Sequence, residues 1–241
     1  MKKNKTTPLI IAHRGYSENF AENSIEAFKQ ALKYPVHGVE LDIQRSSDGH
    51  YFIIHDDNIF SEESGPVPIA NINSKQINKL RSTKNPLPRL EDFLKNYPTD
   101  RFVNFELKWS ITKTDLPIIY SMITKRLNPL HIMISSFNPE LLFFFKKHKL
   151  TIGLLIGEPP ETLSPAYLIK SYIRLRPKWI NPPVLLFFEK KRWLYKILLS
   201  FFKPFVKYAF YTVNSKHEYD LCKKYANAIF TDKIEEALKW K

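Results

Sequence analysis

The chain has few of the residues that define small secreted or membrane-spanning proteins: one cysteine and six glycines among 241 residues. A lone cysteine, Cys222, excludes a disulfide scaffold and fits a reducing compartment. No stretch reaches the roughly 18 uncharged apolar residues of a spanning helix. The basic residues 1–8 lead only into the apolar run Leu9–Ala12, which is too short for a signal-peptide core. We therefore expect a cytoplasmic protein, either free or attached peripherally to a membrane.

Acidic residues are also scarce, with 24 Asp and Glu against 37 Lys and Arg, for a net charge of +13. Basic proteins bind phosphate backbones nonspecifically, so a nucleic-acid partner needs consideration. The lysines are spread through amphipathic segments and no recognition motif is present, so we expect no nucleic-acid partner. The length permits one barrel-sized domain, which we assign to residues 9–239 after a short basic tail, residues 1–8.

Two carboxylates share one side of an apolar segment in the first quarter of the chain. Strand side chains alternate, so Glu40 and Asp42 point away from Val39, Leu41 and Ile43. Like charges on a buried face repel each other and resist desolvation unless a cation joins them. Oxygen ligands without a cysteine cluster favour Mg²⁺ or Ca²⁺ over zinc. Taken alone, the pattern fits a half-exposed strand with a solvated acidic face equally well.

A second alternating segment favours the metal interpretation. In Arg101–Lys108, the polar residues Asn104, Glu106 and Lys108 lie on one face, opposite three apolar residues. Three polar residues facing a barrel interior would make a poor core, which indicates a lined site. Glu106 is then a candidate third ligand and Lys108 a candidate phosphate contact. The alternative is an edge strand with a wet face.

Two histidines follow short apolar strands. His13 and Arg14 end the run Leu9–Ala12, and His55 ends a second run that begins at Tyr51. In barrel enzymes the chemistry lies at the carboxyl ends of the strands. A lone histidine at a strand end is more often structural, but two of them flanking an acid pair favour acid/base catalysis.

Short motifs then follow one another along nearly the whole chain. They are Ala12-His13-Arg14-Gly15, Glu22-Asn23-Ser24, Ala27-Phe28, Val39-Glu40-Leu41-Asp42, Asp48-Gly49, His55-Asp56, Leu87–Asp92, Asn104–Lys108, Ser135-Ser136-Phe137, Tyr211–Asn214 and Phe230-Thr231-Asp232. In this order they resemble the signature of the glycerophosphodiester phosphodiesterase family. The early motifs are specific, whereas each later one alone would be weak.

The resemblance implies a metal-dependent enzyme that hydrolyses glycerophosphodiesters to glycerol 3-phosphate and an alcohol, with a divalent cation (Mg or Ca). The implied metal ligands are Glu40, Asp42 and Glu106, the implied acid/base pair is His13 and His55, and the implied phosphate or substrate contacts are Arg14, Lys108 and Tyr211. Tyr211 stands where the family more often has a pocket-lining tryptophan. Ala21, Ser24 and Ile234 also depart from the family pattern. None of these changes removes a catalytic group, but Tyr211 leaves the substrate preference open.

Three other functions compete with this one. Lysophospholipids could be hydrolysed in a lysophospholipase D-like reaction at a membrane surface, because they present the same phosphate. A catalytically idle membrane-binding barrel is a further alternative. The intact set Glu40, Asp42 and Glu106 argues against a metal-free phosphoinositide phospholipase of similar fold.

The expected fold is α/β, an imperfect TIM-type (β/α)8 barrel of the phospholipase C-like phosphodiesterase kind. The eight expected strands are Leu9–His13, Val39–Gln44, Phe102–Lys108, Ile132–Ser136, Thr151–Ile156, Trp179–Asn181, Phe210–Val213 and Ala228–Thr231. The link before Tyr51 is too short for a parallel crossover, so Tyr51–His55 is expected as an antiparallel hairpin arm after the second strand. This arm should return His55 beside Glu40 or Leu41.

Helices are expected between the strands. Asn23 is the expected cap of a helix over Ser24–Tyr34, and the polar stretch Asp57–Asn85 is expected as an irregular insertion with a short helix near Ser74–Leu80. Residues 189–203 are the least expected segment, because at helical spacing they are apolar over far more than the stripe of about 100° that a barrel helix buries. Either this helix packs against a neighbouring helix or a dimer partner as well as the barrel, or it makes peripheral membrane contact.

Overall fold

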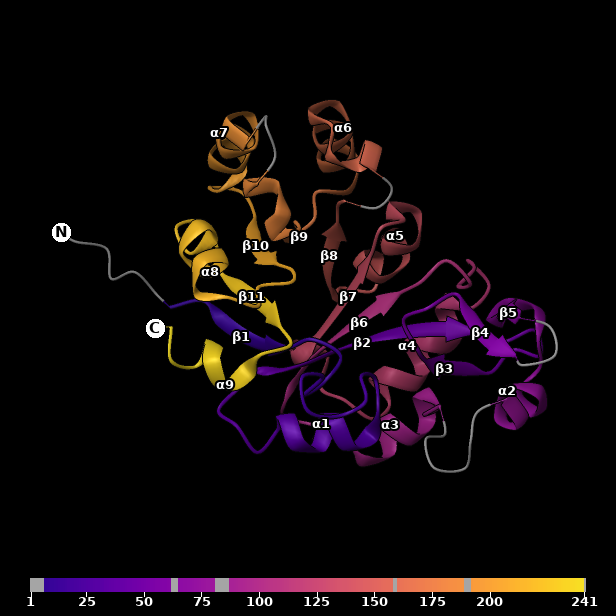
Figure 1. Cartoon of the computed structure of the whole chain (residues 1–241). Helices are drawn as coiled ribbons and strands as arrows, with labels where there is room; N and C mark the ends of the chain where they lie inside the picture. Colours follow the sequence, from indigo (N-terminus) through magenta and orange to yellow (C-terminus); the bar gives the residue numbers. More distant parts are fainter. Residues whose placement is uncertain (1–6, 62–64, 81–86, 158–159, 189–191, 241) are drawn as a thin grey trace.

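The computed structural model describes residues 7–61, 65–80, 87–157, 160–188 and 192–240. Eight parallel strands close into a ring in the order β1, β2, β6, β7, β8, β9, β10, β11, and β11 pairs back to β1 (Figure 1). Their bounds are β1 Leu9–Ala12, β2 Gly38–Arg45, β6 Phe102–Leu107, β7 Ile132–Ser136, β8 Thr151–Leu155, β9 Trp179–Asn181, β10 Lys207–Phe210 and β11 Ala228–Thr231. The predicted eight-stranded α/β barrel is confirmed.

Helices surround this ring (Figure 1). Their bounds are α1 Ile25–Ala31, α2 Ser74–Leu80, α3 Leu90–Asn96, α4 Leu116–Thr124, α5 Pro139–Lys147, α6 Pro165–Leu175, α7 Arg192–Phe202, α8 Lys216–Cys222 and α9 Ile234–Ala237, with short 3-10 turns η1 Ile69–Asn71, η2 Pro129–His131, η3 Pro160–Leu163 and η4 Val184–Phe187. Within the described ranges, none of these helices has the length and apolar character needed to cross a membrane.

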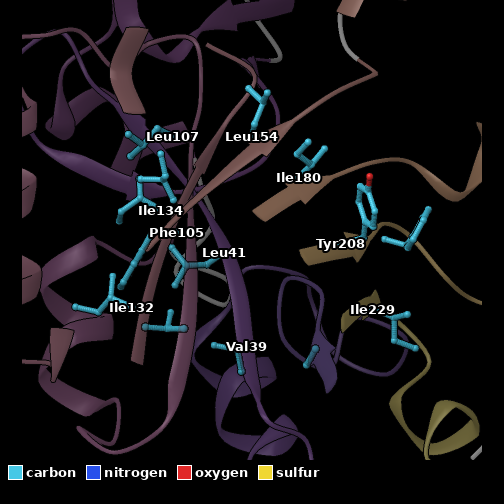
Figure 2. Packing of buried hydrophobic residues seen from close by; sticks show 14 of the residues in the cluster. Val39, Leu41, Phe105, Leu107, Ile132, Ile134, Leu154, Ile180, Tyr208 and Ile229 are labelled. Atoms are coloured by element: carbon cyan, nitrogen blue, oxygen red, sulfur yellow. The ribbon is translucent and has the colours of Figure 1, made fainter. Parts of the chain in front are cut away.

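Alternation along the strands separates the core from the barrel interior. Val39, Leu41 and Phe105 point outward and belong to the main apolar cluster beneath the helices (Figure 2). The ring of Phe93 on α3 lies 6.0 Å from that of Phe105. Gly38 begins β2, and a side chain there would place its Cβ 1.9 Å from the carbonyl oxygen of Phe102. The close pairing of β2 and β6, which carry the predicted acidic residues, therefore needs a glycine at this position.

The predicted hairpin arm is present as β3 (Tyr51–Ile53), antiparallel to β2. Ile43 pairs with Ile53, and the amide of Ile54 donates to the carbonyl of Asp42 at 3.1 Å. Continuing this register by one residue sets His55 opposite Leu41, which is one of the two predicted neighbours. The regular strand ends two residues before His55, so the histidine lies on the loop that leaves the arm.

The stretch expected as an irregular insertion is more regular than predicted. It contains a second hairpin, β4 (Asn58–Ser61) with β5 (Gly65–Pro68), and then α2 over the predicted residues Ser74–Leu80. Side chains of the insertion and of β3 form a separate apolar cluster: Phe52, Ile54, Ile59, Ile69, Ile72 and Ile77. Pro66 and Pro68 hid the hairpin in the sequence, since proline argues against a paired strand but is tolerated at an edge.

Two local predictions were wrong. The tenth strand covers Lys207–Phe210 instead of Phe210–Val213, so Tyr211 follows the strand instead of lying in its middle. The first helix is capped by Ser24, whose hydroxyl accepts from the amide of Ala27, and it ends at Ala31. Asn23 has a φ of 56° and its side chain points to Asp42, so it cannot be the cap.

Candidate active site

The turn after β1 brings His13 and Arg14 to the carboxyl end of the barrel. Gly15 has a φ of 83°, and a Cβ at this position would lie 2.8 Å from Ala27, so the turn can press against α1 only with glycine there. The amide of Arg14 donates to Glu40 Oε2 at 2.9 Å. The backbone of the turn therefore donates a hydrogen bond directly to the acidic cluster.

Three carboxylates converge next to this turn. Register pairs Asp42 directly with Glu106, and Glu40 precedes Asp42 on the same face of β2. One carboxylate oxygen from each of the three lies within 4.8 Å of the other two. The side chains of Glu40 and Asp42 are 3% and 1% exposed, so water screens their mutual repulsion only weakly.

Burial and this repulsion together raise the pKa of two of the three carboxyl groups. Burial, reinforced by Asp42 and Glu106, raises the pKa of Glu40 well above its ordinary value. Burial and then the charge of Asp42 raise the pKa of Glu106 to about 7, although Lys108 opposes the rise. A bound cation would oppose both shifts, because an opposite charge favours the ionised form of a carboxyl group.

Two cationic side chains compensate part of that charge. Lys108 Nζ lies 3.0 Å from Glu106 Oε1 and 3.8 Å from Asp42 Oδ1. The guanidinium of Arg14 lies 3.4 Å from Asp42 Oδ2 and donates to Glu22 Oε2 at 2.8 Å. Burial lowers the pKa of Arg14, but Asp42, Glu40 and Glu22 outweigh it and raise the pKa overall. Both predicted phosphate contacts therefore reach the carboxylate cluster.

The residues present fit a bound divalent cation. Glu40 Oε1 is buried and has no hydrogen-bond partner within the described residues, while Glu40 Oε2 accepts from Arg14. A buried carboxylate oxygen without a partner destabilises the fold unless a bound ion or water molecule pairs with it. All donors are hard oxygens, which suits Mg²⁺ or Ca²⁺.

His13 lies between two acids supplied by the strands on either side of it. Register pairs Ala12 with Val39 and with Thr231, so the next residue of each strand is Glu40 and Asp232. His13 Nδ1 is 2.8 Å from Asp232 Oδ1, and His13 Nε2 is 3.9 Å from Glu40 Oε2. With Nδ1 donating to Asp232, Nε2 is directed at the carboxylate cluster.

Asp232 is a site residue to which the sequence interpretation gave no role. It also accepts hydrogen bonds from Ser17 at 2.9 Å and from Asn214 at 2.6 Å. Burial favours a higher pKa, but the hydrogen bond and charge of His13, together with these two donors, lower the pKa of Asp232 to about 2. The sequence signal for this role was an acidic residue directly after the last strand, because Asp232 follows β11 as His13 follows β1.

Asn23 is a second residue whose role was missed. Its side-chain amide donates to Asp42 Oδ2 at 2.8 Å and holds that carboxylate toward the cluster. An asparagine in the left-handed region, immediately before a helix that Ser24 caps, is free to point elsewhere.

His55 borders the site from the hairpin side. Its Nδ1 lies 2.9 Å from Asp56 Oδ1, and its side chain is 33% exposed. One open cavity of about 360 Å³ is lined by His55 together with Lys108 and Trp109, and a second contains His55 with Glu22 and Asn23. His55 thus shares cavities with residues that contact Asp42 and Arg14, as the predicted hairpin geometry requires.

Tyr211 lies further round the mouth of the barrel. Its hydroxyl donates to the carbonyl of Ile156 at 2.6 Å, and its ring meets that of Phe137 edge-on at 6.3 Å. Phe137 lines a hollow that also contains Glu106 and Lys108. The structure therefore brings six of the eight predicted site residues together at the carboxylate cluster. His55 lines cavities that border this cluster, and Tyr211 lies one ring away from it.

Comparison with known proteins gives a consistent family. Residues 13–236 match the model of the glycerophosphoryl diester phosphodiesterase family. A glycerophosphodiester phosphodiesterase from Caldanaerobacter subterraneus is 35% identical over 61% of this chain and 66% of its own length. Glycerophosphodiester phosphodiesterase 1 from Rattus norvegicus is 28% identical over 64% of this chain and 50% of its own length. The chain thus spans between half and two thirds of the length of these two curated relatives.

Solved structures match over almost the whole chain. A glycerophosphodiester phosphodiesterase from Thermotoga maritima has a TM-score of 0.80 and 25% identity, covering 98% of this chain and 99% of that one. An Oleispira antarctica phosphodiesterase, solved with the product sn-glycerol 3-phosphate, has a TM-score of 0.76 and 19% identity, with 97% of each chain covered.

Proposed function

Since the chain belongs to the glycerophosphoryl diester phosphodiesterase family, we propose that it hydrolyses a glycerophosphodiester to glycerol 3-phosphate and an alcohol. One observation carries this proposal. Two buried carboxylates, Glu40 and Asp42, converge with the partly buried Glu106, and Glu40 Oε1 has no hydrogen-bond partner among the described residues. Two cationic side chains and a histidine lie beside them at the carboxyl end of the barrel. A glycerophosphodiester presents an anionic phosphate that such a cation-rich rim would bind, and the product found in the Oleispira protein agrees with this substrate class.

Glu40, Asp42 and Glu106 would hold a divalent cation, Mg²⁺ or Ca²⁺, which when bound supplies Lewis-acid stabilisation of the phosphate charge. Arg14 and Lys108 would share the remaining charge of the phosphate, because both already lie against the carboxylate cluster. The ion pairs of Arg14 and Lys108 with acidic side chains also hold these two basic side chains in place before the substrate arrives.

Two histidines would move the protons. Asp232 holds His13 by Nδ1, which leaves Nε2 able to exchange a proton at the phosphate side of the site. His55 would serve the opposite side of the phosphate from the hairpin loop. The nucleophile is either water or the neighbouring hydroxyl of the glycerol, and a diester lacking that hydroxyl distinguishes the two, since only the water route would still release its alcohol.

A panel of glycerophosphodiesters tests the function directly. Release of glycerol 3-phosphate from glycerophosphocholine, glycerophosphoethanolamine and glycerophosphoinositol should be seen with Mg²⁺ or Ca²⁺ and be lost in excess chelator. Failure of every diester to release glycerol 3-phosphate, with either cation, would exclude the proposal. Unchanged release in chelator after dialysis would keep the reaction but exclude the metal.

Lysophospholipids are a second candidate substrate, because they carry the same phosphate. The observation that favours them is the exposed apolar side of α7, within the predicted membrane segment 189–203, of which the structure describes residues 192–203. Residues 189–191 lie outside the described residues. Adding a lysophospholipid to the diester panel, in vesicles and in detergent, tests this candidate.

A further inference from the structure

Exposed apolar side chains are concentrated on one side of the barrel. Thirteen large apolar residues are exposed in the described part of the chain, and eight of them lie between Ile169 and Phe205. On α7, Trp193, Ile197 and Phe201 are 62%, 56% and 65% exposed and recur every four residues, so they form one stripe. Isolated exposed apolar residues are ordinary, whereas a stripe of this kind marks an interaction surface.

The neighbouring helix extends this surface. α6 and α7 lie side by side on the outside of the barrel (Figure 1), and the rings of Tyr172 and Phe202 meet between them at 4.9 Å. Leu168 and Leu175 bury the inner side of α6, so its outer side carries Ile169 and Ile173, the latter 66% exposed. The outward sides of the two helices together form what we call the α6–α7 face.

The charge of this region is as uneven as its apolar exposure. From Ser164 to Phe210 the sequence has ten Lys and Arg residues and one acidic residue, Glu189. This segment therefore carries nine of the thirteen net positive charges, and the rest of the chain is close to balanced. Lys170, which follows Ile169 on α6, and Lys196, which precedes Ile197 on α7, are both exposed.

We propose that the α6–α7 face binds the surface of an anionic lipid bilayer. Apolar side chains that project from a basic surface match the acyl boundary and the anionic headgroups of such a bilayer. A second copy of the chain fits less well, because two such faces would bring like charges together. A nucleic acid would leave Trp193, Ile197 and Phe201 without an apolar partner.

The turn η4, which follows the carboxyl end of β9, contacts α7 and so joins the α6–α7 face to the mouth of the barrel. Leu185 and Phe188 are 63% and 51% exposed at this turn, and Pro183, just before them, pairs with Tyr211. Resting on the proposed function, this placement would bring a bilayer close to the substrate entrance and favour diesters that carry an acyl chain.

Vesicle co-sedimentation tests the binding without reference to catalysis. The purified chain should sediment with vesicles of phosphatidylcholine mixed with phosphatidylserine, and much less with phosphatidylcholine alone. Trp193→Ser with Phe201→Ser should weaken this binding by about tenfold or more, because two large side chains no longer enter the acyl boundary. Lys170→Glu with Lys196→Glu should weaken it by about tenfold and reduce its salt dependence.

Matched controls separate this face from general stickiness or charge. Phe60→Ser with Leu130→Ser removes two residues that are 71% and 84% exposed elsewhere, and Lys29→Glu with Lys95→Glu changes the same net charge on α1 and α3. Both controls should bind as the parent does. All variants should keep the parental melting temperature and the parental hydrolysis of a soluble diester. Sedimentation is measured independently of hydrolysis. A parent without activity would therefore count against the proposed function and not against the binding.

Three results would overturn the inference. The first is a parent that does not sediment with anionic vesicles. The second is a Trp193→Ser, Phe201→Ser variant that binds them as the parent does. The third is a parent that is a dimer by light scattering, becomes a monomer in that variant and binds no vesicles, since a second copy would then cover the face. If the first result is found and the parent binds a nucleic-acid duplex, nucleic acid replaces the lipid as the partner of this face.

Discussion

Glu40→Gln is expected to stabilise the protein without metal and to abolish its stabilisation by a divalent cation. Glutamine keeps the shape of the side chain and an acceptor for the amide of Arg14. It removes a buried charge that Asp42 and Glu106 oppose, and it replaces the unpartnered Oε1 by an amide that can donate to these neighbouring carboxylates. The single change should therefore move the two states of the protein in opposite directions.

Both effects are large enough to measure. Relief of a buried, uncompensated charge contributes about 1–2 kcal/mol, which for a chain of this size raises the melting temperature in chelator by roughly 2–8 °C. A cation present at about one hundred times its Kd stabilises the parent by about 2.7 kcal/mol, or roughly 5–11 °C. The variant should start above the parent in chelator and gain nothing from Mg²⁺ or Ca²⁺.

Thermal unfolding followed by circular dichroism, in chelator and in excess cation, gives both numbers. Glu22→Gln is the matched control, because Glu22 also pairs with Arg14 but is half exposed and lies outside the three carboxylates. This control should keep the full metal-dependent shift. Two results would refute the assignment of the metal ligands. One is a parent whose melting temperature does not change with either cation. The other is a Glu40→Gln protein whose melting temperature rises with cation as that of the parent does.

Three further predictions concern the remaining site residues. His55→Ala should lower kcat by about a hundredfold or more with KM and melting temperature nearly unchanged; near-normal turnover would make His55 structural. Asp232→Asn should shift the pH–rate profile that depends on His13 and lower the free energy of unfolding at neutral pH. The folded pKa of Asp232 is lowered to about 2, so the stabilisation by its ionised form exists above about pH 4 and fades toward pH 2. The difference between parent and variant in urea unfolding should therefore shrink on acidification. A difference that stays constant with pH would argue against this role of Asp232. Tyr211→Phe should cost about 1 kcal/mol of unfolding free energy, since the carbonyl of Ile156 loses its donor, and should change the ratio of kcat/KM between two diesters; an unchanged ratio would remove Tyr211 from substrate selection.

The site residues on β2 and β6 could be predicted because the period of a strand is strict. Glu40 and Asp42 share a face whatever the tertiary context, and a slip of one residue would have turned the apolar side chains of β2 into the barrel interior and the acids into the apolar cluster. The pairing of Asp42 with Glu106 needed only that the two strands be neighbours in register. Alternation within each strand, together with the expected neighbouring of these two barrel strands, was therefore enough to place the three carboxylates together.

The contact between His13 and Asp232 could not be read in the same way. The two residues are 219 positions apart and meet only because β11 closes the barrel against β1. The bounds of β10 failed for a related reason. From Lys207 onward the sequence favours a strand for seven residues, and only the pairing of Lys207 with Trp179 and of Phe210 with Ile229 decides where the strand lies.

The packing of α7 could be predicted from the sequence only in part. Its sequence predicted an apolar surface wider than one barrel can bury, but it could not say which residues dock and which remain exposed. The fold divides them: Leu199 and Phe202 are 5% and 3% exposed against the barrel and α6, whereas Trp193, Ile197 and Phe201 stay outside. Stability alone would be served by polar residues at those three positions, because nothing in the described part of the fold covers them. Their presence is a cost in solubility that a membrane-facing surface would explain.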